Sequence, residues 1–247
     1  MEQNSLKPNN HKENLSSSVL FTFTPRMEFM LEMIGNGIVP RYSYERLPGS
    51  KKHYIVPMKC FCDIPLGKVK NHMQRYGYYG IGLKKSFLQS HGASPVIYIH
   101  KNSERFFGLK KMKGLTFDKS PFLPLLKRYF GDDFFFGEHP DDIQHKRIRF
   151  YDEREWRFLP KNVIPEIDNN IMTIREGLEL VRKKNLLTPF VSTPIKPTIN
   201  DIEYIIIHKK KEVSTIIEKL RLIYGETQDW EIILTKIVVA EQVLKDY

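Results

Sequence analysis

The chain has 247 residues, 41% of them hydrophobic and 12% aromatic, which is enough apolar material for a core and excludes a disordered chain. No stretch approaches the roughly 18–20 uncharged apolar residues that span a bilayer, and the polar start lacks the apolar region of a secretory signal. The net charge of +10 suits an anionic partner, but the lysine clusters are short and scattered, so direct nucleic-acid binding is not favoured.

Two cysteines, Cys60 and Cys62, are too few for a disulfide framework. A reduced, cytoplasmic setting without membrane association is therefore predicted. Residues 1–17 are rich in Asn, Ser and Lys and predict a flexible polar tail. Residues 18–247 contain no long linker and predict a single domain.

Segments of strand and helix character follow one another along this domain. Runs rich in β-branched and aromatic residues predict strands at 19–24, 38–45, 54–66 (broken by Pro57 and Pro65), 81–87, 94–101, 146–160, 202–209 and, before a last short turn, within 230–247. Helical spacing and glycine stops predict helices at 27–37, 67–77, 177–187 and 212–225. Because there is no regular βαβ repetition, an α+β fold is expected, with a mixed, mostly antiparallel sheet and flanking helices.

The segment FYDEREWRFLP, residues 150–160, is the most conspicuous of these strands. If it is extended throughout, alternation places Glu153, Glu155 and Arg157 on one face, with the carboxylates about 7 Å apart. Such a group is costly to bury and is typical of a cleft, where one Glu accepts a hydrogen bond from a hydroxyl. The alternative is the solvent face of an edge strand, with Glu153 and Arg157 pairing across it.

Three further motifs carry weaker signals. In CFCDIP the two thiols are read as small buried groups, since no second cysteine pair completes a zinc site, and Asp63 is either a loop cap or a site residue. RYGYYGIGL is not a phosphate loop, but its tyrosines, Tyr79 among them, either stack on a planar ligand or pack in the core. Residues 137–145, GEHPDDIQH, predict a polar surface loop, and no metal site is expected.

Several of these motifs stand in the order of a known family: VLFTFT with IVPRYSYE, VPMKCFCDIPL, YGYYGIGLKKSF with PVIYI, FYDEREWRFLP and LTKIVVAEQVLKD. Over residues 19–247 the chain resembles the AbiGi family of bacterial abortive-infection proteins. The resemblance implies a role in phage defence, with the family acting as the antitoxin of a toxin–antitoxin pair. It also implies a protein partner, either the cognate toxin or a phage component.

A second resemblance is to the ADP-ribosyltransferase-like fold, in the opening strand, the helix that ends at glycine, and the late Glu-x-Glu strand. It implies NAD as cofactor, with Glu155 at the nicotinamide ribose and Glu153 assisting. The first strand has no Arg or His, so Arg41 takes that place only if the fold brings it to the cleft. Six residues are predicted to bind ligand: Thr24, Arg41, Tyr42, Asp63, Tyr79 and Arg157.

Three hypotheses follow from these interpretations. The first is a component of a phage-defence system that acts by binding a partner or a ligand. The second is an NAD-dependent ADP-ribosyltransferase-like enzyme that uses Glu155. The third is a nucleic-acid-binding regulator, which requires the lysine runs to gather on one face.

Overall fold

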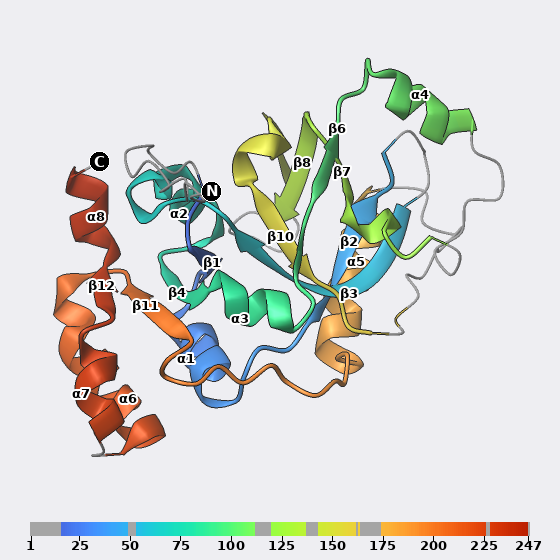
Figure 1. The fold of residues 1–247 in the computed structure, drawn as a ribbon. Helices are drawn as coiled ribbons and strands as arrows, with labels where there is room; N and C mark the ends of the chain where they lie inside the picture. Colours follow the sequence, from blue (N-terminus) through green and yellow to red (C-terminus); the bar gives the residue numbers. More distant parts are fainter. Residues whose placement is uncertain are drawn as a thin grey trace, which may run out of the picture.

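A computed structural model describes residues 16–48, 53–111, 120–136, 143–161, 163, 174–225 and 228–246. Figure 1 shows helices packed around a central sheet, with α6, α7 and α8 gathered at one end. The sheet order is β12-β11-β4-β1-β3-β10-β5, and β2 also pairs with β3. Among the strand pairs described for this sheet, only β11 and β12 run parallel, so the predicted mixed, mostly antiparallel sheet with flanking helices is confirmed.

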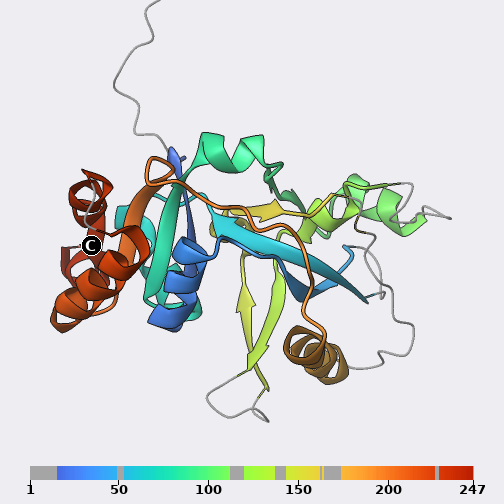
Figure 2. The ribbon, with the colours of Figure 1, turned by 90° about the horizontal axis from the view of Figure 1, so that it is seen from below.

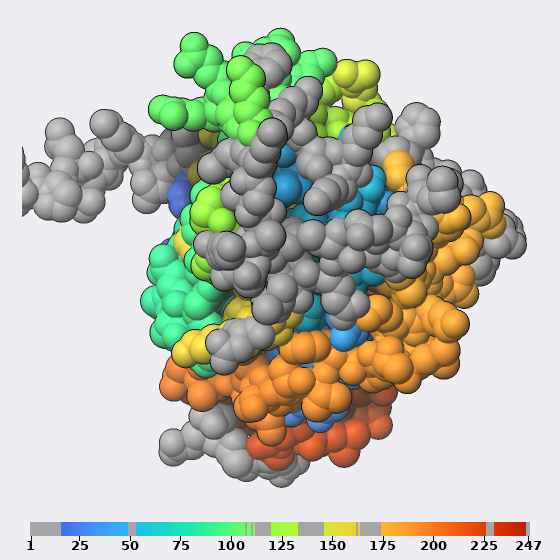
Figure 3. Space-filling model, turned by 90° about the vertical axis from the view of Figure 1, so that its right-hand side faces the viewer, coloured from blue at the N-terminus to red at the C-terminus, as the bar shows by residue number. Residues whose placement is uncertain are grey.

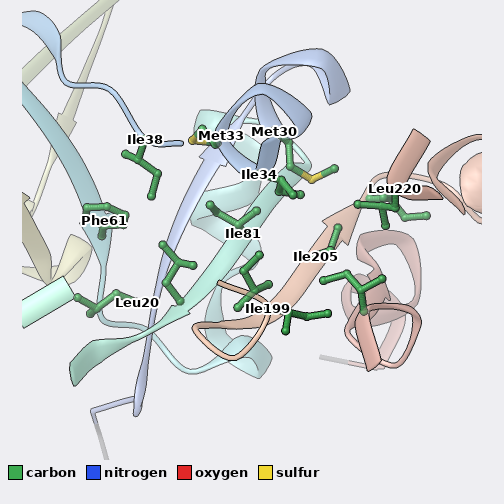
Figure 4. Close-up of a cluster of buried hydrophobic side chains, with 14 of the residues drawn as sticks. Leu20, Met30, Met33, Ile34, Ile38, Phe61, Ile81, Ile199, Ile205 and Leu220 are labelled. Carbon is green, nitrogen blue, oxygen red and sulfur yellow. The ribbon is translucent and has the colours of Figure 1, made fainter. Parts of the chain in front are cut away.

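One end of the sheet is formed by strands that are largely apolar. We call it the apolar half-sheet: β12 (Ile237–Val239), β11 (Ile202–Ile207), β4 (Tyr79–Lys84) and β1 (Val19–Thr24). Helices cover it: α1 (Met27–Gly35), α2 (Lys70–Tyr76), α3 (Lys85–Ser90), α6 (Val213–Tyr224), α7 (Gln228–Leu234) and α8 (Ala240–Asp246). Met30, Met33 and Ile34 of α1 lie over Ile81 on one face (Figure 4), while Met73 of α2 belongs to the cluster on the other.

The other end carries the charged residues, and we call it the charged half-sheet. Its strands are β2 (Arg41–Arg46), β3 (His53–Cys62), β10 (Glu155–Phe158) and β5 (Ser94–Pro95). Around it lie the parallel pair β6 (Ile97–Ile99) and β7 (Leu126–Arg128), α4 (Glu104–Lys111) and α5 (Ile174–Leu187). The hairpin of β8 (Gly131–Phe136) and β9 (Ile143–Ile148) projects from the body on the same side as α5 (Figure 2).

The two half-sheets meet at a narrow junction. β1 pairs with β4 along its whole length, from Val19 to Thr24, but with β3 only at Phe21 and Cys62. Beyond that point β3 pairs with β2 and β10 instead. β1 and β3 therefore splay apart, and the sheet splits between the end of β1 and the middle of β3.

The strand predicted for residues 146–160 is wrong in its centre. β9 ends at Ile148, a 3-10 turn covers Phe150–Glu153, and β10 begins only at Glu155. Arg154 has φ of 44°, the left-handed conformation that few non-glycine residues adopt. Its carbonyl accepts a hydrogen bond from the N–H of Asp63 (3.0 Å), and this contact holds the turn. Strand alternation therefore does not relate Glu153 to Glu155.

Three other sequence predictions need correction. Pro57 does not break its strand, because β3 runs through it opposite Tyr42, and β10 pairs with β3 only from Lys59 onward. A missing N–H is tolerated where one side of a strand has no partner strand. The strand predicted within residues 230–247 is β12, which covers only Ile237–Val239, and α7 precedes it, with Trp230 and Ile233 spaced to face the core together. The last segment is a helix, α8, rather than a short turn.

The predicted stop of the helix near residues 76–77 is confirmed. Gly77 ends α2 with φ of 113°, and a Cβ there would lie 2.2 Å from the carbonyl oxygen of Thr24. Only glycine fits this close approach of the backbone to the end of β1. Gly77 therefore seats α2 beside the junction of the half-sheets.

Some predictions lie outside the described residues. These include the tail over residues 1–15, and the part of the 137–145 loop that precedes β9. Ser16 and Ser17 are described, and both hydrogen-bond the Asp63 carboxylate. Across the described ranges, no helix combines the length and apolar character needed to cross a membrane.

Candidate functional site

A cavity of about 620 Å³ lies where the sheet splits. Its walls come from β1, α1, β2, β3, α2, β7, the turn before β10, β10 itself, and the segment after α5. Figure 3 views the molecule from the side of α5 and shows the orange segment that follows this helix beside the blue and cyan of β2 and β3. The splay of β1 from β3 is what leaves room for the cavity.

Lys127 of β7 joins the two predicted carboxylates on one wall. Its Nζ lies 2.6 Å from Oε2 of Glu155 and 3.0 Å from Oε2 of Glu153. Glu153 and Glu155 are each 7% exposed, so both are buried. The edge-strand alternative, with these side chains on a solvent face, is therefore wrong. A lysine between them relieves the repulsion that two adjacent buried carboxylates would otherwise exert.

Glu153 has two further partners from α2. The Tyr76 hydroxyl donates to its Oε1 over 2.6 Å, and Nη1 of Arg75 lies 3.0 Å from the same oxygen. The short helix α2 supplies both groups because they are adjacent just before Gly77. The 3-10 turn directs Glu153 toward α2, which an extended strand would not do.

Arg157 lies behind Glu155 and is fully buried, with 0% exposure. Its Nε donates to Oε1 of Glu155 (2.7 Å), its Nη2 lies 2.9 Å from Oε2 of Glu45, and its Nη1 donates to the carbonyl of Pro124 (2.5 Å). These contacts use three of the five N–H donors of the guanidinium fork, one on each nitrogen. We call the connected set the ionic network: Glu45, Arg75, Lys127, Glu153, Glu155 and Arg157.

The network determines how these groups titrate. Desolvation alone would raise the pKa of both carboxyls, but Arg157 and Lys127 hold the pKa of Glu155 far below its usual range, and Lys127 lowers that of Glu153. Glu153 and Glu155 raise the pKa of Lys127 in return, against its own desolvation. Both carboxylates are therefore ionised at neutral pH. They suit the acceptance of hydrogen bonds and not the donation of a proton.

The cavity has unreactive neighbours beside the network. Burial raises the pKa of Cys60, which lines the cavity, and that of Cys62, so both thiols stay protonated, and both cysteines are free. Burial also lowers the pKa of His72 to about 4, which keeps its ring neutral between Phe23 and Tyr76. Within the described ranges, no three His, Cys, Asp or Glu side chains are grouped to hold a metal ion.

The structure brings some of the predicted site residues together and leaves others apart. Thr24, Arg41, Glu153 and Glu155 line the cavity, and Arg157 supports Glu155 from behind. Tyr42 does not line it; its backbone N–H and carbonyl bond the side-chain amide of Asn185 instead, which anchors one wall.

Asp63 and Tyr79 lie away from the cavity lining. Asp63 accepts hydrogen bonds from Ser16, Ser17 and Lys85, so it ties the start of β1 to α3. The Tyr79 hydroxyl donates to Oε1 of Glu212 over 2.7 Å. The side chains of both residues are therefore bonded to other parts of the fold and not directed at the cavity.

Sequence reasoning missed Lys127, Arg75 and Lys59, which also line the cavity. Lys127 sits in a short strand within a mixed Phe- and Lys-rich region, with no motif around it. Arg75 is the first residue of RYGYYGIGL, where only the tyrosines were considered as ligand contacts, and its place on the last turn of a short helix was a usable signal. Lys59 precedes Cys60 in a strand with no other charge from 54 to 62.

Comparison with known proteins places the chain in a family. A family model described as "Putative abortive phage resistance protein AbiGi, antitoxin" matches residues 36–208, well over half of the chain. The abortive phage resistance protein AbiGi of Lactococcus lactis subsp. cremoris is 24% identical over 259 aligned positions, covering 85% of this chain and 99% of that protein. No solved structure matches, so the ADP-ribosyltransferase-like fold stays a prediction. The chain belongs to the AbiGi family of abortive phage resistance proteins.

Proposed function

We propose that this chain acts in abortive phage resistance by binding a small polar ligand in the cavity between the half-sheets. The observation that carries the proposal is the ionic network on the cavity wall. Removing paired charges from water costs several kcal/mol per ion, and apolar replacements are often no less stable. Stability alone does not explain a charged wall, whereas a polar ligand does. A volume of about 620 Å³ lies within the range of small-molecule sites.

The network also indicates what kind of group the ligand presents. Tyr76, Arg75 and Lys127 together occupy three acceptor positions of Glu153. An ionised carboxylate offers about four such positions, so one remains for the ligand. A carboxylate in this state accepts only, and the matching ligand group is a hydroxyl or an N–H donor.

Filling the cavity tests the proposal. Ser43 lines the cavity from β2 and is half-buried, so Ser43→Trp occupies the ligand volume from a strand surface. The control is Ser214→Trp on the exposed face of α6. Phage plating efficiency on cells that express each variant is the readout, with thermal unfolding to verify the fold. We expect Ser43→Trp to abolish protection and the control to keep it. Full protection by a folded Ser43→Trp variant rejects the proposal.

The family description as an antitoxin supports a protein partner as well. The segment that walls the cavity continues into exposed apolar side chains, with Leu186 70%, Leu187 69% and Val191 90% exposed. We propose that the cognate toxin contacts this surface, next to the ligand. Val191→Asp is expected to reduce protection, whereas Leu222→Asp, 83% exposed on α6, is not. Equal protection by both variants would argue against this surface.

One observation favours a second function, an enzyme of ADP-ribosyltransferase type. Arg41 and Glu155 line the same cavity, as that hypothesis requires, and Glu155 is ionised and suited to accept a hydrogen bond from a ribose hydroxyl. The test measures NAD consumption and target labelling by the purified wild-type chain. The Arg41→Gln variant, in which an exposed residue of the cavity is changed, is measured beside it. If the wild-type chain neither consumes NAD nor labels protein, the enzyme hypothesis is rejected. The nucleic-acid hypothesis stays a prediction.

A further inference from the structure

The cavity wall contains two cations that the network leaves unpaired. Glu45, Glu153 and Glu155 are each matched by Arg157, Lys127 or Arg75. Arg41 of β2 and Lys59 of β3 have no ion pair with any carboxylate of the described residues, although both line the cavity. The exposed Glu32 also lines it and is not ion-paired to either.

We propose that Arg41 and Lys59 form a phosphate-binding subsite of this cavity, so that its ligand is a phosphorylated small molecule that also carries hydroxyl groups. The inference rests on the proposed function, because it names the class of ligand that the cavity takes. The two cations lie on adjacent strands, and because Arg41 pairs with Met58, strand alternation turns Lys59 to the other face of the pair. Both side chains nevertheless line the cavity, and Arg41 is near enough to lower the pKa of Lys59. A phosphate group between them would satisfy both charges at once.

The surroundings of Lys59 show why an anion is favourable there. Lys59 is partly buried opposite Phe158, and the titratable groups that act on it are Arg41 and Cys60, whose thiol stays protonated and therefore neutral. Burial, with a smaller effect of Arg41, lowers the pKa of Lys59 to about 8. A partly desolvated ammonium without a counter-ion is costly, and a bound anion removes that cost.

Arg41 is oriented by an aromatic neighbour. Its guanidinium carbon lies 5.6 Å from the ring centroid of Phe29, which also lines the cavity. A cation over an aromatic ring keeps its N–H donors free for another acceptor. Phosphate oxygens match a guanidinium in two-point geometry, which favours phosphate over a single carbonyl.

The carboxylates and the cations that line the cavity together restrict which chemical groups the ligand can carry. Acceptors at Glu153 and Glu155 require donors such as sugar hydroxyls, and the cations at Arg41 and Lys59 require an anion. The cavity volume of about 620 Å³ suits a molecule of nucleotide size. A sugar phosphate or a nucleoside diphosphate combines these features, whereas inorganic phosphate engages only the cationic wall.

Direct binding measurements test the subsite. Calorimetric titration with adenosine diphosphate, ribose 5-phosphate and inorganic pyrophosphate is carried out on the wild-type chain, Arg41→Gln, Lys59→Gln and the control Lys101→Gln. Lys101 is exposed, so its replacement removes the same charge away from the cavity. We expect at least one of the three compounds to bind the wild-type chain, with affinity lost roughly 10- to 100-fold in each cavity variant and less than about 2-fold in the control.

The pH dependence supplies a readout that a structural defect would not mimic. The anion binds the protonated form of Lys59, so wild-type affinity is full well below pH 8 and falls as the pH rises through and beyond about 8. Lys59→Gln is expected to bind weakly with no such fall. Arg41→Gln, which changes an exposed side chain, is expected to fold normally and to keep the pH dependence.

The following outcomes would overturn the inference. One is that none of the three compounds binds the wild-type chain, and another is that both cavity variants bind as the wild type does. The third is that Ser43→Trp abolishes phage protection while Arg41→Gln and Lys59→Gln retain it, which means that the ligand carries no phosphate. In that third case the proposed function stands and only the phosphate subsite fails. Full protection by Ser43→Trp rejects both.

Discussion

The two half-sheets are stabilised in different ways. In the apolar half-sheet, Ile202, Ile205, Ile206 and Ile207 of β11 are fully or almost fully buried, and helices cover both faces. In the charged half-sheet, the fully buried side chain of β10 is Arg157, and Glu155 in the same strand is almost as buried. Removal of apolar surface from water stabilises the apolar half-sheet. The charged half-sheet depends instead on pairing the charges that folding removes from water.

This difference indicates where the chain is free to change. Apolar packing tolerates a swap between hydrophobic residues of similar volume at modest cost. An ionic network does not, because removing one member leaves a buried partner uncompensated. Glu45, Lys127, Glu153 and Glu155 of the ionic network line the cavity, so the half-sheet that tolerates substitution least is also the one that would contact the proposed ligand. The following predictions test this contrast.

The largest effect is expected for Arg157→Met. Glu155 loses its buried guanidinium partner, Glu45 loses its ion pair, and the carbonyl of Pro124 loses a donor. We expect the free energy of unfolding to fall by about 3–5 kcal/mol, measured by urea denaturation at pH 7. The control is Arg149→Met, because Arg149 pairs with Asp152 while both side chains are 55% exposed. That change should leave the free energy of unfolding almost unchanged, because solvent screens an exposed ion pair. Similar losses in the free energy of unfolding for the two variants would show that the buried network is no more sensitive to substitution than an exposed ion pair.

A somewhat smaller effect is expected in the apolar half-sheet for Ile205→Ala. Ile205 is fully buried in the same cluster as Ile216 and Leu220 of α6, and truncation leaves a cavity that costs about 2–5 kcal/mol in the free energy of unfolding. Because no charge is involved, the loss should be the same at pH 7 and pH 4. Ile232→Ala on α7, 44% exposed, is the control and should cost less than about 1 kcal/mol. A pH-dependent loss for Ile205→Ala would contradict the assignment of this half to apolar packing.

The smallest and most specific effect concerns acid. The folded-state pKa values of Glu153 and Glu155 are lowered from 4.5, so the unfolded chain takes up protons first as the pH falls. The stabilisation that these carboxylates give is present above about pH 4.5 and is lost as the pH falls toward their folded pKa values. Glu155→Gln should be less stable at pH 7 and lose less below pH 4.5, as followed by denaturation at a series of pH values. Parallel curves for wild type and variant would show that the network does not set the acid response.

Parts of the fold were predictable because local chemistry decides them. VLFTFT forms β1, the periodic run before Gly225 forms α6, and Gly77 ends α2. Within residues 230–247 the sequence predicted a strand but not α7, because a short apolar run fits either structure until its packing is known. The turn at Arg154 was missed because no proline or glycine marks it, and a contact with Asp63 holds it in place.

The candidate site was predictable only in part. The Glu-x-Glu-x-Arg spacing was enough to single out Glu155 and Arg157, since alternation within one strand is a local property. Glu153 joins them for another reason, namely that the turn and α2 bring it to Lys127. Asp63 and Tyr79 stood in equally suggestive motifs, yet their partners are Lys85 and Glu212. Motif spacing cannot distinguish these outcomes, because the partners come from distant parts of the chain.

The sequence by itself determined an α+β chain with a conspicuous carboxylate pair, because propensity, periodicity and strand alternation act over a few residues. Only the tertiary structure decided that the sheet splits beside β1, that Lys127 bridges Glu153 and Glu155, and that Arg41 and Lys59 line the same cavity without an ion pair among the described residues. The physical reason is that charge pairing and desolvation depend on which distant strands come together, and no local pattern records that choice.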